Sequence, residues 1–144
     1  MTSELVISPA HSDNEILDTR DVMCQLRPHL SIDDYEATIR RMMSSDGYRL
    51  VALRDRGLVR AVAGYRLMEM LTYGRIIKVD DLATEERFRS RGYGRSLLTW
   101  LKEEGRRHGC SELHLDSGVH RDTTHRFYFR EGLTINCFHF RTAL

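Results

Sequence analysis

Glycines and arginines gather in one short segment of the chain, Arg-Ser-Arg-Gly-Tyr-Gly-Arg at residues 89–95. A strand-like apolar stretch precedes this segment, and a helix-like amphipathic stretch follows it. Glycine lets the backbone turn tightly and lets a ligand approach its amides, while the first turn of a helix offers unpaired N–H groups and a positive dipole end. Arg89, Arg91 and Arg95 add charge-assisted donors that suit a pyrophosphate group. The segment therefore predicts a phosphate-binding loop at the start of a helix.

The glycine spacing does not fit two common nucleotide-binding motifs. The third glycine of the dinucleotide-binding fingerprint would fall at Leu97, and the lysine of the Walker loop is absent. A tight turn leading into a solvated basic helix is the alternative interpretation of these glycines taken alone. The strand before the loop and the helix after it are what favour a phosphate site.

The elements around this loop predict one α+β domain over residues 1–144, with a central mixed β-sheet flanked by about four helices. Apolar spacing and capping residues predict helices over 12–26, 31–46, 93–108 and 121–130. β-like stretches predict strands over 5–7, 48–53, 58–68, 75–83, 111–117 and 133–141. A turn at 55–57 makes a hairpin, and the helix over 93–108 makes its two flanking strands a parallel crossover.

Composition excludes several classes of function. With 144 residues, 41% apolar and 30% charged, the chain has the size and balance of one globular domain. Its 22 basic and 21 acidic residues leave no overall field for nucleic acid or an anionic membrane. No apolar run is long enough for a membrane span, and residues 1–10 lack the pattern of a signal peptide. The three cysteines indicate neither a disulfide framework nor structural zinc, so we expect a soluble protein of the reducing cytoplasm.

Arg89, Gly92 and Gly94 follow the pattern [Arg/Gln]-x-x-Gly-x-[Gly/Ala], and residues 127–133 read Phe-Tyr-Phe-Arg-Glu-Gly-Leu. In this order and at this distance, the two segments resemble the GNAT superfamily of N-acetyltransferases, and the order of helices and strands is similar along nearly the whole chain. The resemblance implies a GNAT-like acyl-CoA N-acyltransferase fold. It also implies an enzyme that moves an acetyl group from acetyl-CoA to a primary amine by direct transfer in a ternary complex.

The resemblance further implies which residues hold the acetyl-CoA. The pantetheine arm would pair with backbone beside the strand at Leu82 and Thr84, and the pyrophosphate would sit on amides of the loop. The implied cofactor-binding residues are Leu82, Ala83, Thr84, Arg89, Ser90, Arg91, Gly92, Tyr93, Gly94 and Arg95. Tyr128 would lie near the thioester sulfur. The family often has an asparagine where this chain has Arg121.

Acyl transfer to an amine needs an unprotonated amine, donors for the oxyanion and a proton for the leaving thiolate. Tyr128, with an ordinary tyrosine pKa of about 10, stays protonated at neutral pH and is the candidate donor to the sulfur. A buried aromatic with a satisfied hydroxyl is the alternative interpretation. A bulge near Leu82 or Ala83 would expose a backbone amide to the oxyanion.

Asp80 and Asp81 end the central strand and are the candidate bases. Successive strand residues point to opposite faces, so at most one of them is expected to meet the acceptor directly. Asp81 shares the parity of Ile77 and Val79, which predicts a partly buried carboxylate with a raised pKa. Capping of loop amides and a water relay are the alternatives.

The resemblance places the acceptor opposite the cofactor, between the helix break at 27–29 and the loop at 69–73. The candidate substrate-binding residues are Arg27, His29, Tyr65, Tyr73 and His125. This mixed polar and aromatic set fits a protein N-terminus, a lysine, an amino acid or a small amine. The acyl group of the donor stays open between acetyl and a longer chain.

Other classes of protein fit parts of the sequence. His114, Asp116, His120 and His125 lack an H-E-x-x-H or Cys/His pattern, so we expect no metal. A catalytically silent acyl-CoA-binding regulatory or sensor module is the main alternative to an enzyme. The family's second closing strand is hard to find in the short tail, so a partner subunit that completes the sheet, and hence a homodimer, is a hypothesis.

Overall fold

The computed structural model describes residues 4–144. Residues 1–3 of the N-terminal segment, which lacks the pattern of a signal peptide, lie outside that range. The strands are β1 (Leu5–Pro9), β2 (Arg49–Asp55), β3 (Leu58–Met70), β4 (Gly74–Thr84) and β5 (Glu112–Leu115). The helices are α1 (Asp13–Asp18), α2 (Arg20–Leu26), α3 (Tyr35–Asp46), α4 (Tyr93–Arg107) and α5 (Asp122–Arg130), with the 3₁₀ helix η1 (Glu86–Phe88) after β4. The described chain forms two compact units, one ending at His114 and one from Leu115 to Leu144.

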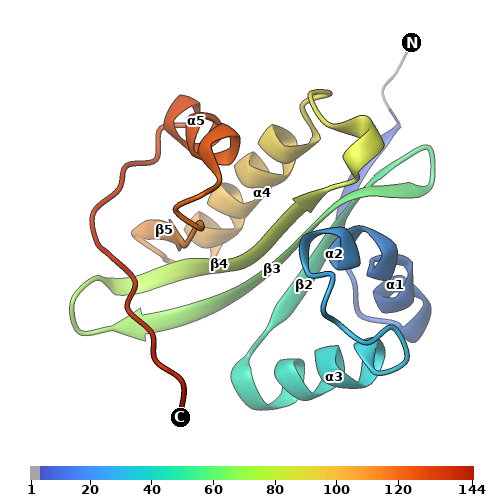
Figure 1. The fold of residues 1–144 in the computed structure, drawn as a ribbon, viewed down its shortest axis with the longest axis horizontal. Coiled ribbons are helices and arrows are strands. Elements are labelled where there is room, and N and C mark those ends of the chain that lie inside the picture. The colour runs from blue at the N-terminus through green and yellow to red at the C-terminus, as the bar shows by residue number, and fades with distance from the viewer. Residues whose placement is uncertain (1–3) are drawn as a thin grey trace. The chain divides into compact units, whose positions relative to one another are not determined.

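The sheet has the order β1-β2-β3-β4-β5, and its first four strands pair antiparallel (Figure 1). β5 begins beside the start of β4, where the Ser111 amide donates to the Arg75 carbonyl at 2.9 Å. Because β5 neighbours β4 and continues from that point along it, the two strands run parallel, joined through α4. The predicted hairpin and the predicted mixed sheet are therefore confirmed.

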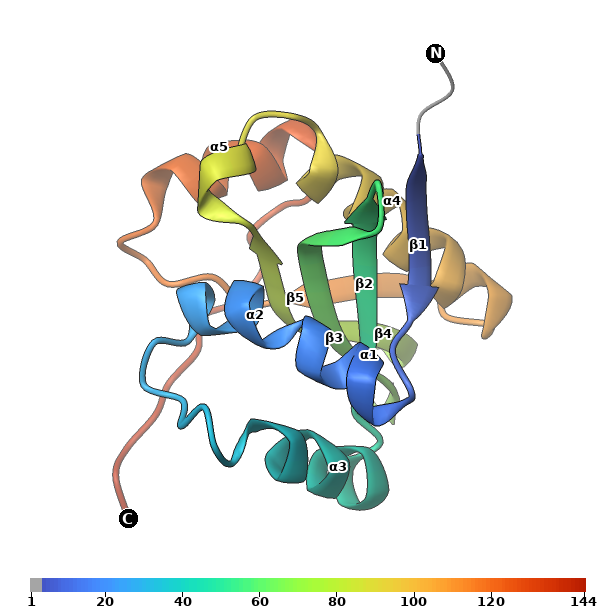
Figure 2. The same cartoon turned by 90° about the vertical axis from the view of Figure 1, so that its right-hand side faces the viewer.

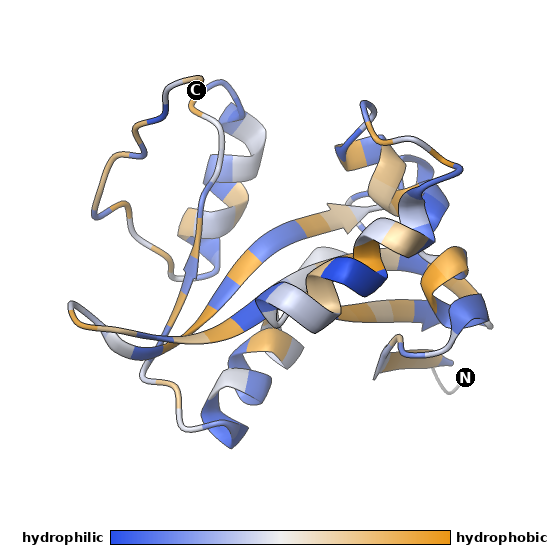
Figure 3. Cartoon of the chain, turned by 90° about the horizontal axis from the view of Figure 1, so that it is seen from below, coloured by the Kyte–Doolittle hydropathy of each residue, from blue (hydrophilic) through white to orange (hydrophobic). Residues whose placement is uncertain are grey.

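Helices cover both faces of the sheet in the first unit (Figure 2). α1, α2 and α3 lie on one face, over a buried cluster formed by Ala10, Ile16, Val22, Met23, Tyr35, Ile39, Tyr48, Leu50, Ala52, Val62 and Ala83. α4 lies on the other face, where Leu97, Leu98 and Leu101 are buried. Hydrophobic and hydrophilic stretches both occur along the strands (Figure 3), and the middle of β2, residues 50–53, is a continuous buried apolar run, as expected for a strand that is covered on both faces.

The first predicted helix, over 12–26, is two helices that meet at Thr19. Ser12 caps α1 through a capping box with Glu15, as its sequence suggests. The buried Thr19 hydroxyl donates to the Ile16 carbonyl at 2.6 Å and lies 2.8 Å from the Tyr35 hydroxyl. These side-chain bonds compete with the helical pattern, and they explain the break.

The predicted strand over 133–141 is wrong. Residues 133–144 adopt no regular secondary structure, although their alternation of apolar and polar side chains is typical of a strand. Alternation reports which side chains share a face, but a strand also needs a neighbour to pair with its backbone. The described chain supplies no such neighbour to this segment.

Candidate functional site

A β-bulge interrupts β4 at the pair of aspartates. Gly64 of β3 lies opposite Asp81, and the next residue of β3 lies opposite Val79, so Asp80 is the extra residue. A bulge near residues 82–83 was expected, and the shift in register comes earlier along the strand.

The bulge turns Asp81 to the face opposite Ile77 and Val79, and the predicted shared face is wrong. Val79 pairs with Tyr65, whose hydroxyl points to α4. Asp81 instead reaches the face covered by α2 and α3, where the Tyr48 hydroxyl donates to its Oδ2 at 2.8 Å. The simple alternation used for the prediction fails because the extra residue resets it.

Asp80 lies on the same face as Asp81, although successive strand residues were expected to point to opposite faces. Its carboxylate accepts two hydrogen bonds from Arg66, both at 2.8 Å, and Arg66 alternates with Tyr65 along β3. The Asp80 carbonyl also accepts from Arg27 at 3.1 Å. Asp80 is thus held by a fork of two parallel bonds, a geometry that fixes its position.

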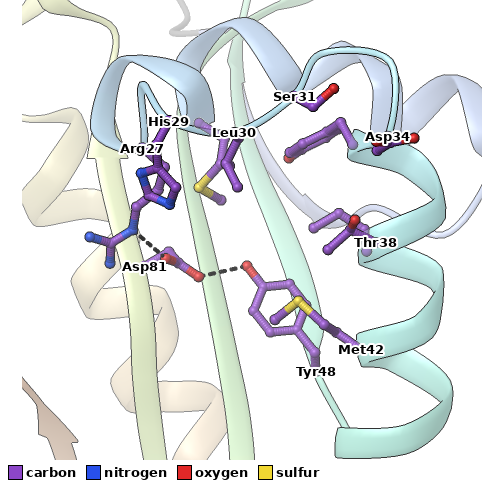
Figure 4. Close-up of a pocket in the computed structure, with 12 residues that line it drawn as sticks. Arg27, His29, Leu30, Ser31, Asp34, Thr38, Met42, Tyr48 and Asp81 are labelled. Atoms are coloured by element: carbon purple, nitrogen blue, oxygen red, sulfur yellow. Dashed lines mark hydrogen bonds and ion pairs between the residues drawn. The ribbon is translucent and has the colours of Figure 1, made fainter. Parts of the chain in front are cut away.

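A cavity of about 340 Å³ opens beside Asp81, between α2, the 27–34 segment and α3 (Figure 4). It is lined by Met23, Arg27, His29, Leu30, Ser31, Asp34, Tyr35, Thr38, Ile39, Met42, Tyr48 and Asp81. The walls combine apolar side chains with carboxylates, hydroxyls and one guanidinium. Such a pocket suits a small ligand that carries a polar group.

Two donors from different elements hold the Asp81 carboxylate in this pocket. Arg27, at the end of α2, donates from Nε to Oδ1 at 3.0 Å, and Tyr48 donates to Oδ2 (Figure 4). The Asp81 side chain is 15% exposed. Burial, followed by the negative charge of Asp81, raises the pKa of Tyr48 well above its ordinary value, so Tyr48 remains a donor.

Gly64 makes the contact between Tyr48 and Asp81 possible. A Cβ atom at Gly64 would lie 1.7 Å from the Tyr48 hydroxyl oxygen. Only a residue without a Cβ lets the tyrosine ring cross β3 at this point. Sequence reasoning missed Tyr48, because a tyrosine at a strand start and a glycine in the next strand do not reveal that they touch.

Of the predicted acceptor residues, Arg27 and His29 line the pocket, and the other three lie elsewhere. Tyr65 is buried against Glu104 under α4, and burial together with that hydrogen bond raises its pKa. The Tyr73 ring packs against the His114 ring with centroids 4.4 Å apart. His125 lies in the second unit, with Nε2 2.8 Å from the Gly118 carbonyl oxygen.

Gln25 ties α2 to the end of β4. Its amide oxygen accepts from the Glu86 backbone at 2.8 Å, and its amide nitrogen donates to Glu85 Oε1 at 3.4 Å. Arg27, at the C-terminal end of α2, is thereby placed over the bulge. The pocket and the segment that leads to the glycine loop are therefore one connected piece of structure.

The predicted phosphate-binding loop has left-handed backbone at Ser90 (φ 68°) and Gly92 (φ 81°). Gly92 is the N-cap of α4, and the first helical bond runs from the Ser96 amide to its carbonyl. The amides of Tyr93 and Gly94 precede that bond at the positive end of a 15-residue helix. Left-handed turns of this kind gather amides into an anion-binding concavity.

Basic side chains surround this loop at the surface. Arg89, Arg91 and Arg95 are exposed. The guanidinium of Arg91 lies 4.9 Å from the centre of the Phe88 ring. Stacking on an aromatic ring orders an arginine before any anion arrives, so the loop has the charge that its sequence suggests.

The edge of β4 is covered by β5 over only part of its length. β5 has four residues and starts beside Arg75, whereas β4 runs on to Thr84. Leu82, Ala83 and Thr84 pair with β3 on their other side. Backbone groups of this last part of β4 lie next to the glycine loop, where an extended ligand arm can pair with them.

Tyr128 lies on α5, in the second unit. Burial raises its pKa above the ordinary tyrosine value, with an opposing effect from Arg121. Its ring centre is 5.4 Å from that of Phe127. The hydroxyl is therefore protonated at neutral pH, as a proton donor must be.

Within residues 4–144, no group of three or more His, Cys, Asp or Glu side chains is arranged to hold a metal ion. His114 instead lies 2.7 Å from a carboxylate oxygen of Glu112, and Asp116 lies 3.5 Å from His139. None of the described helices is long and apolar enough to cross a membrane.

Comparison with known proteins is consistent across sequence and structure. The model of the acetyltransferase (GNAT) family matches residues 16–132. The chain is 31% identical over 131 residues to the uncharacterized N-acetyltransferase YhdJ of Bacillus subtilis, covering 90% of this chain and 92% of that protein. It is 32% identical over 97 residues to the aminoalkylphosphonate N-acetyltransferase of Salmonella typhimurium, covering 67% and 62% of the two chains.

Among solved structures, the aminoglycoside N-acetyltransferase AAC(6')-Iy in complex with CoA superposes with a TM-score of 0.83. That match covers 100% of this chain and 98% of the other. Because the two chains are only 16% identical, the match supports the fold alone. The family match spans most of the chain and includes both the glycine loop and α5. The chain therefore belongs to the acetyltransferase (GNAT) family and has its fold.

Proposed function

We propose that this chain is an N-acetyltransferase that moves the acetyl group of acetyl-CoA to a small primary amine in a ternary complex. The observation that carries the proposal is the position of the last part of β4 between two features. Asp81 in this part lines the pocket, and the chain after Thr84 leads to the Ser90–Gly92 loop. Residues 1–144 would act as one catalytic domain in the cytoplasm, without a metal. The family match, which extends across both compact units, supports a single domain.

The loop residues fit a coenzyme with a pyrophosphate. The amides of Tyr93 and Gly94 and the exposed Arg89 and Arg91 would hold the phosphates, and the end of β4 at 82–84 would pair with the pantetheine arm. When bound, acetyl-CoA supplies an activated acyl thioester. A solved relative of this fold carries CoA, which supports the same coenzyme here.

Asp81 is the group that we propose for the acceptor amine. It lies at the bulge, where β4 changes from pocket wall to cofactor edge, and its charge attracts an ammonium group. Asp81 would pass the amine proton to water, and Tyr48 would keep the carboxylate in place. Asp80, held by Arg66, would position the bulge, and a backbone amide near Ala83 would meet the oxyanion.

Tyr128 would return a proton to the departing sulfur, since burial keeps its hydroxyl protonated. In this scheme the acceptor ammonium would give up one proton to solvent through Asp81, and its nitrogen would lose a second proton as it forms the amide bond. The thiol leaving group would take the Tyr128 proton, and the second nitrogen proton would restore Tyr128, so that one proton is released in total.

The size and charge of the pocket favour a small zwitterionic amine as the acceptor. A volume of about 340 Å³ lies at the small end of the range for ligand pockets and suits a small acceptor. Arg27 lies against Asp81, so an acceptor with both an ammonium and an anion could exchange partners with this ion pair. The Salmonella relative is named for aminoalkylphosphonates, which are amines of this class.

Acetyl-CoA binding should be measured first, by titration calorimetry on the wild type, Gly92→Val and Gly109→Val. Both glycines have left-handed backbone, with φ 81° and 73°, and neither has atoms within 4 Å of an added Cβ. The two variants therefore carry similar backbone strain, but only Gly92 shapes the loop. We expect binding by the wild type and Gly109→Val and at least a tenfold loss in Gly92→Val; no binding by the wild type would end the acetyl-CoA assignment.

The acceptor proposal is tested by thiol release with matched amines, such as 3-aminopropylphosphonate and propylamine. We expect the zwitterion to react with at least tenfold higher kcat/KM, and we expect Arg27→Gln to remove this preference. Asp81→Asn should lower kcat/KM for both amines, since each loses its carboxylate partner. If acetyl-CoA binds but no amine releases thiol, the silent binding module becomes the better description.

A further inference from the structure

A second cavity opens in the first unit, where β2 begins, and the proposed acetyl transfer makes no use of it. Its volume is about 310 Å³, and it is lined by Met43, Gly47, Tyr48, Arg49, Leu67 and Arg75. The lining combines the C-terminal end of α3 with parts of β2, β3 and β4. Tyr48 is the one residue that lines both this cavity and the pocket at Asp81.

Three of the lining side chains lie on one face of the sheet. Arg49 of β2 pairs with Tyr65 of β3, and Leu67, two residues further along β3, pairs with Ile77 of β4. Arg75 lies two residues before Ile77 on β4. Directly paired residues share a face of a sheet, and so do residues two apart on a strand. Leu67, on the middle strand, therefore lies between arginines from the two strands beside it.

The charged side chains that line this cavity are all positive. The lining contains two exposed arginines and no acidic residue from the described part of the chain, whereas the pocket at Asp81 contains two aspartates. Asp46 precedes Gly47, and Glu69 pairs with Arg75 across the strands, but neither carboxylate lines the cavity. Two guanidinium groups with an apolar surface between them attract an organic anion.

Arg75 is held in place by the protein itself. Its Nε donates to the His108 carbonyl, at the C-terminal end of α4, at 2.7 Å. This contact directs the terminal nitrogens of Arg75 to a different acceptor, and it gives no reason for an arginine at position 49. The end of α3 beside the cavity is also bonded, since the Tyr48 amide donates to the Met42 carbonyl at 3.1 Å. The carbonyls of both helix ends are thus occupied.

We propose that this cavity binds a phosphate monoester with a short aliphatic chain, held between Arg49 and Arg75. Two positive charges favour a dianion over a monoanion, and each guanidinium can donate to phosphate oxygens in a bidentate manner. The aliphatic chain would lie on Leu67 and Met43. A volume of about 310 Å³ suits a ligand of this size. The cavity shares no residue with the glycine loop, so the anion would bind with or without acetyl-CoA.

The test is a titration of the ¹⁵N-labelled full chain with butyl phosphate at about pH 8, where a phosphate monoester is a dianion. The amide signals of Gly47, Arg49 and Leu67 report this cavity, and those of Asp81 and Gly92 report the acceptor pocket and the glycine loop. We expect saturable shifts at the first three, with butylamine, of similar size and opposite charge, leaving them in place. Shifts confined to Asp81 or Gly92, or no saturable shift at all, would overturn the proposal.

Variants show whether the two arginines hold the anion. Arg49→Gln/Arg75→Gln removes both guanidiniums, and Arg41→Gln/Arg56→Gln removes the same charge from exposed positions outside the cavity. We expect roughly tenfold or weaker binding in the first variant, because two charge-assisted contacts are lost, and an unchanged dissociation constant in the second. Arg49→Gln and Arg75→Gln, each alone, should weaken binding by less, and they serve if the double variant does not fold. Equal binding by the wild type and the cavity variants, or an equal loss in the control, contradicts the site.

Discussion

Both carboxylate oxygens of Asp81 accept a hydrogen bond, one from Arg27 and one from Tyr48. A ligand can displace one of these two donors more easily than the other. Tyr48 is buried and directly precedes β2, whereas the Arg27 side chain is 38% exposed. A buried partner is costly to displace, while a half-exposed arginine can regain hydrogen bonds from water or from a ligand anion. At the scale of single residues, Arg27 is therefore the movable partner and Tyr48 the fixed one.

Replacing Tyr128 with Phe removes the hydroxyl while keeping the ring. Because burial raises the pKa of Tyr128, the lost group is a protonated donor. We expect kcat to fall about 100-fold, with little change in the affinity for acetyl-CoA. Steady-state kinetics and calorimetry on Tyr128→Phe, with Phe129→Leu on the same helix as the control, measure both quantities. Equal losses in turnover and coenzyme affinity would instead indicate a packing role.

At the scale of elements, one inserted residue organises the site. The bulge at Asp80 moves the odd-numbered side chains of β4 from the face of α4, where Ile77 lies, to the face of the pocket, where Asp81 lies. Gly64 in β3 and Gln25 in α2 hold the neighbouring elements around this point. The geometry of the pocket therefore depends on contacts between β2, β3, β4 and α2 rather than on any one of them.

Gly64→Ala tests this dependence. The added Cβ would lie 1.7 Å from the Tyr48 hydroxyl oxygen, so the tyrosine must leave its position beside Asp81. We expect a loss of about 1–3 kcal/mol in the free energy of unfolding, as for other overpacked sites, together with a higher KM for the amine. The measurement is urea unfolding of both single variants and of Gly64→Ala/Tyr48→Ala.

In the Tyr48→Ala background the same substitution should cost much less, because the clash is absent. If Gly64→Ala costs the same in both backgrounds, the ring is not what requires the glycine.

At the scale of the whole molecule, several tyrosines are buried with raised pKa values. Burial raises the pKa of Tyr35 to about 12, and burial also raises the pKa of Tyr48 and Tyr65. In an unfolded chain a tyrosine titrates near 10, so above that pH the unfolded state has fewer bound protons than the folded state. This contribution to stability is fully present below about pH 10 and is lost as the pH rises towards 12.

We therefore expect cooperative alkaline unfolding that begins above about pH 10, with tyrosinate absorbance and loss of circular dichroism rising together. Tyr35→Phe should make the fall of stability with pH less steep, because one linked proton is removed. Tyrosinate formation near pH 10 in a chain that stays folded would contradict the burial of these hydroxyls. Urea unfolding at a series of alkaline pH values gives the slope.

The sequence by itself determined the order of most elements, the glycine turn that begins α4, and the family. These depend on local patterns: strand alternation, helical spacing, the conformational freedom of Gly92 and the charge of its arginine neighbours. The tertiary structure decided the face on which Asp81 lies, the choice of Arg27 and His29 over Tyr65 and Tyr73 in the pocket, and the loss of the strand at 133–141. Each depends on a partner distant in the chain: one extra residue resets the alternation of a strand, a pocket needs several elements in place, and a strand needs a neighbour.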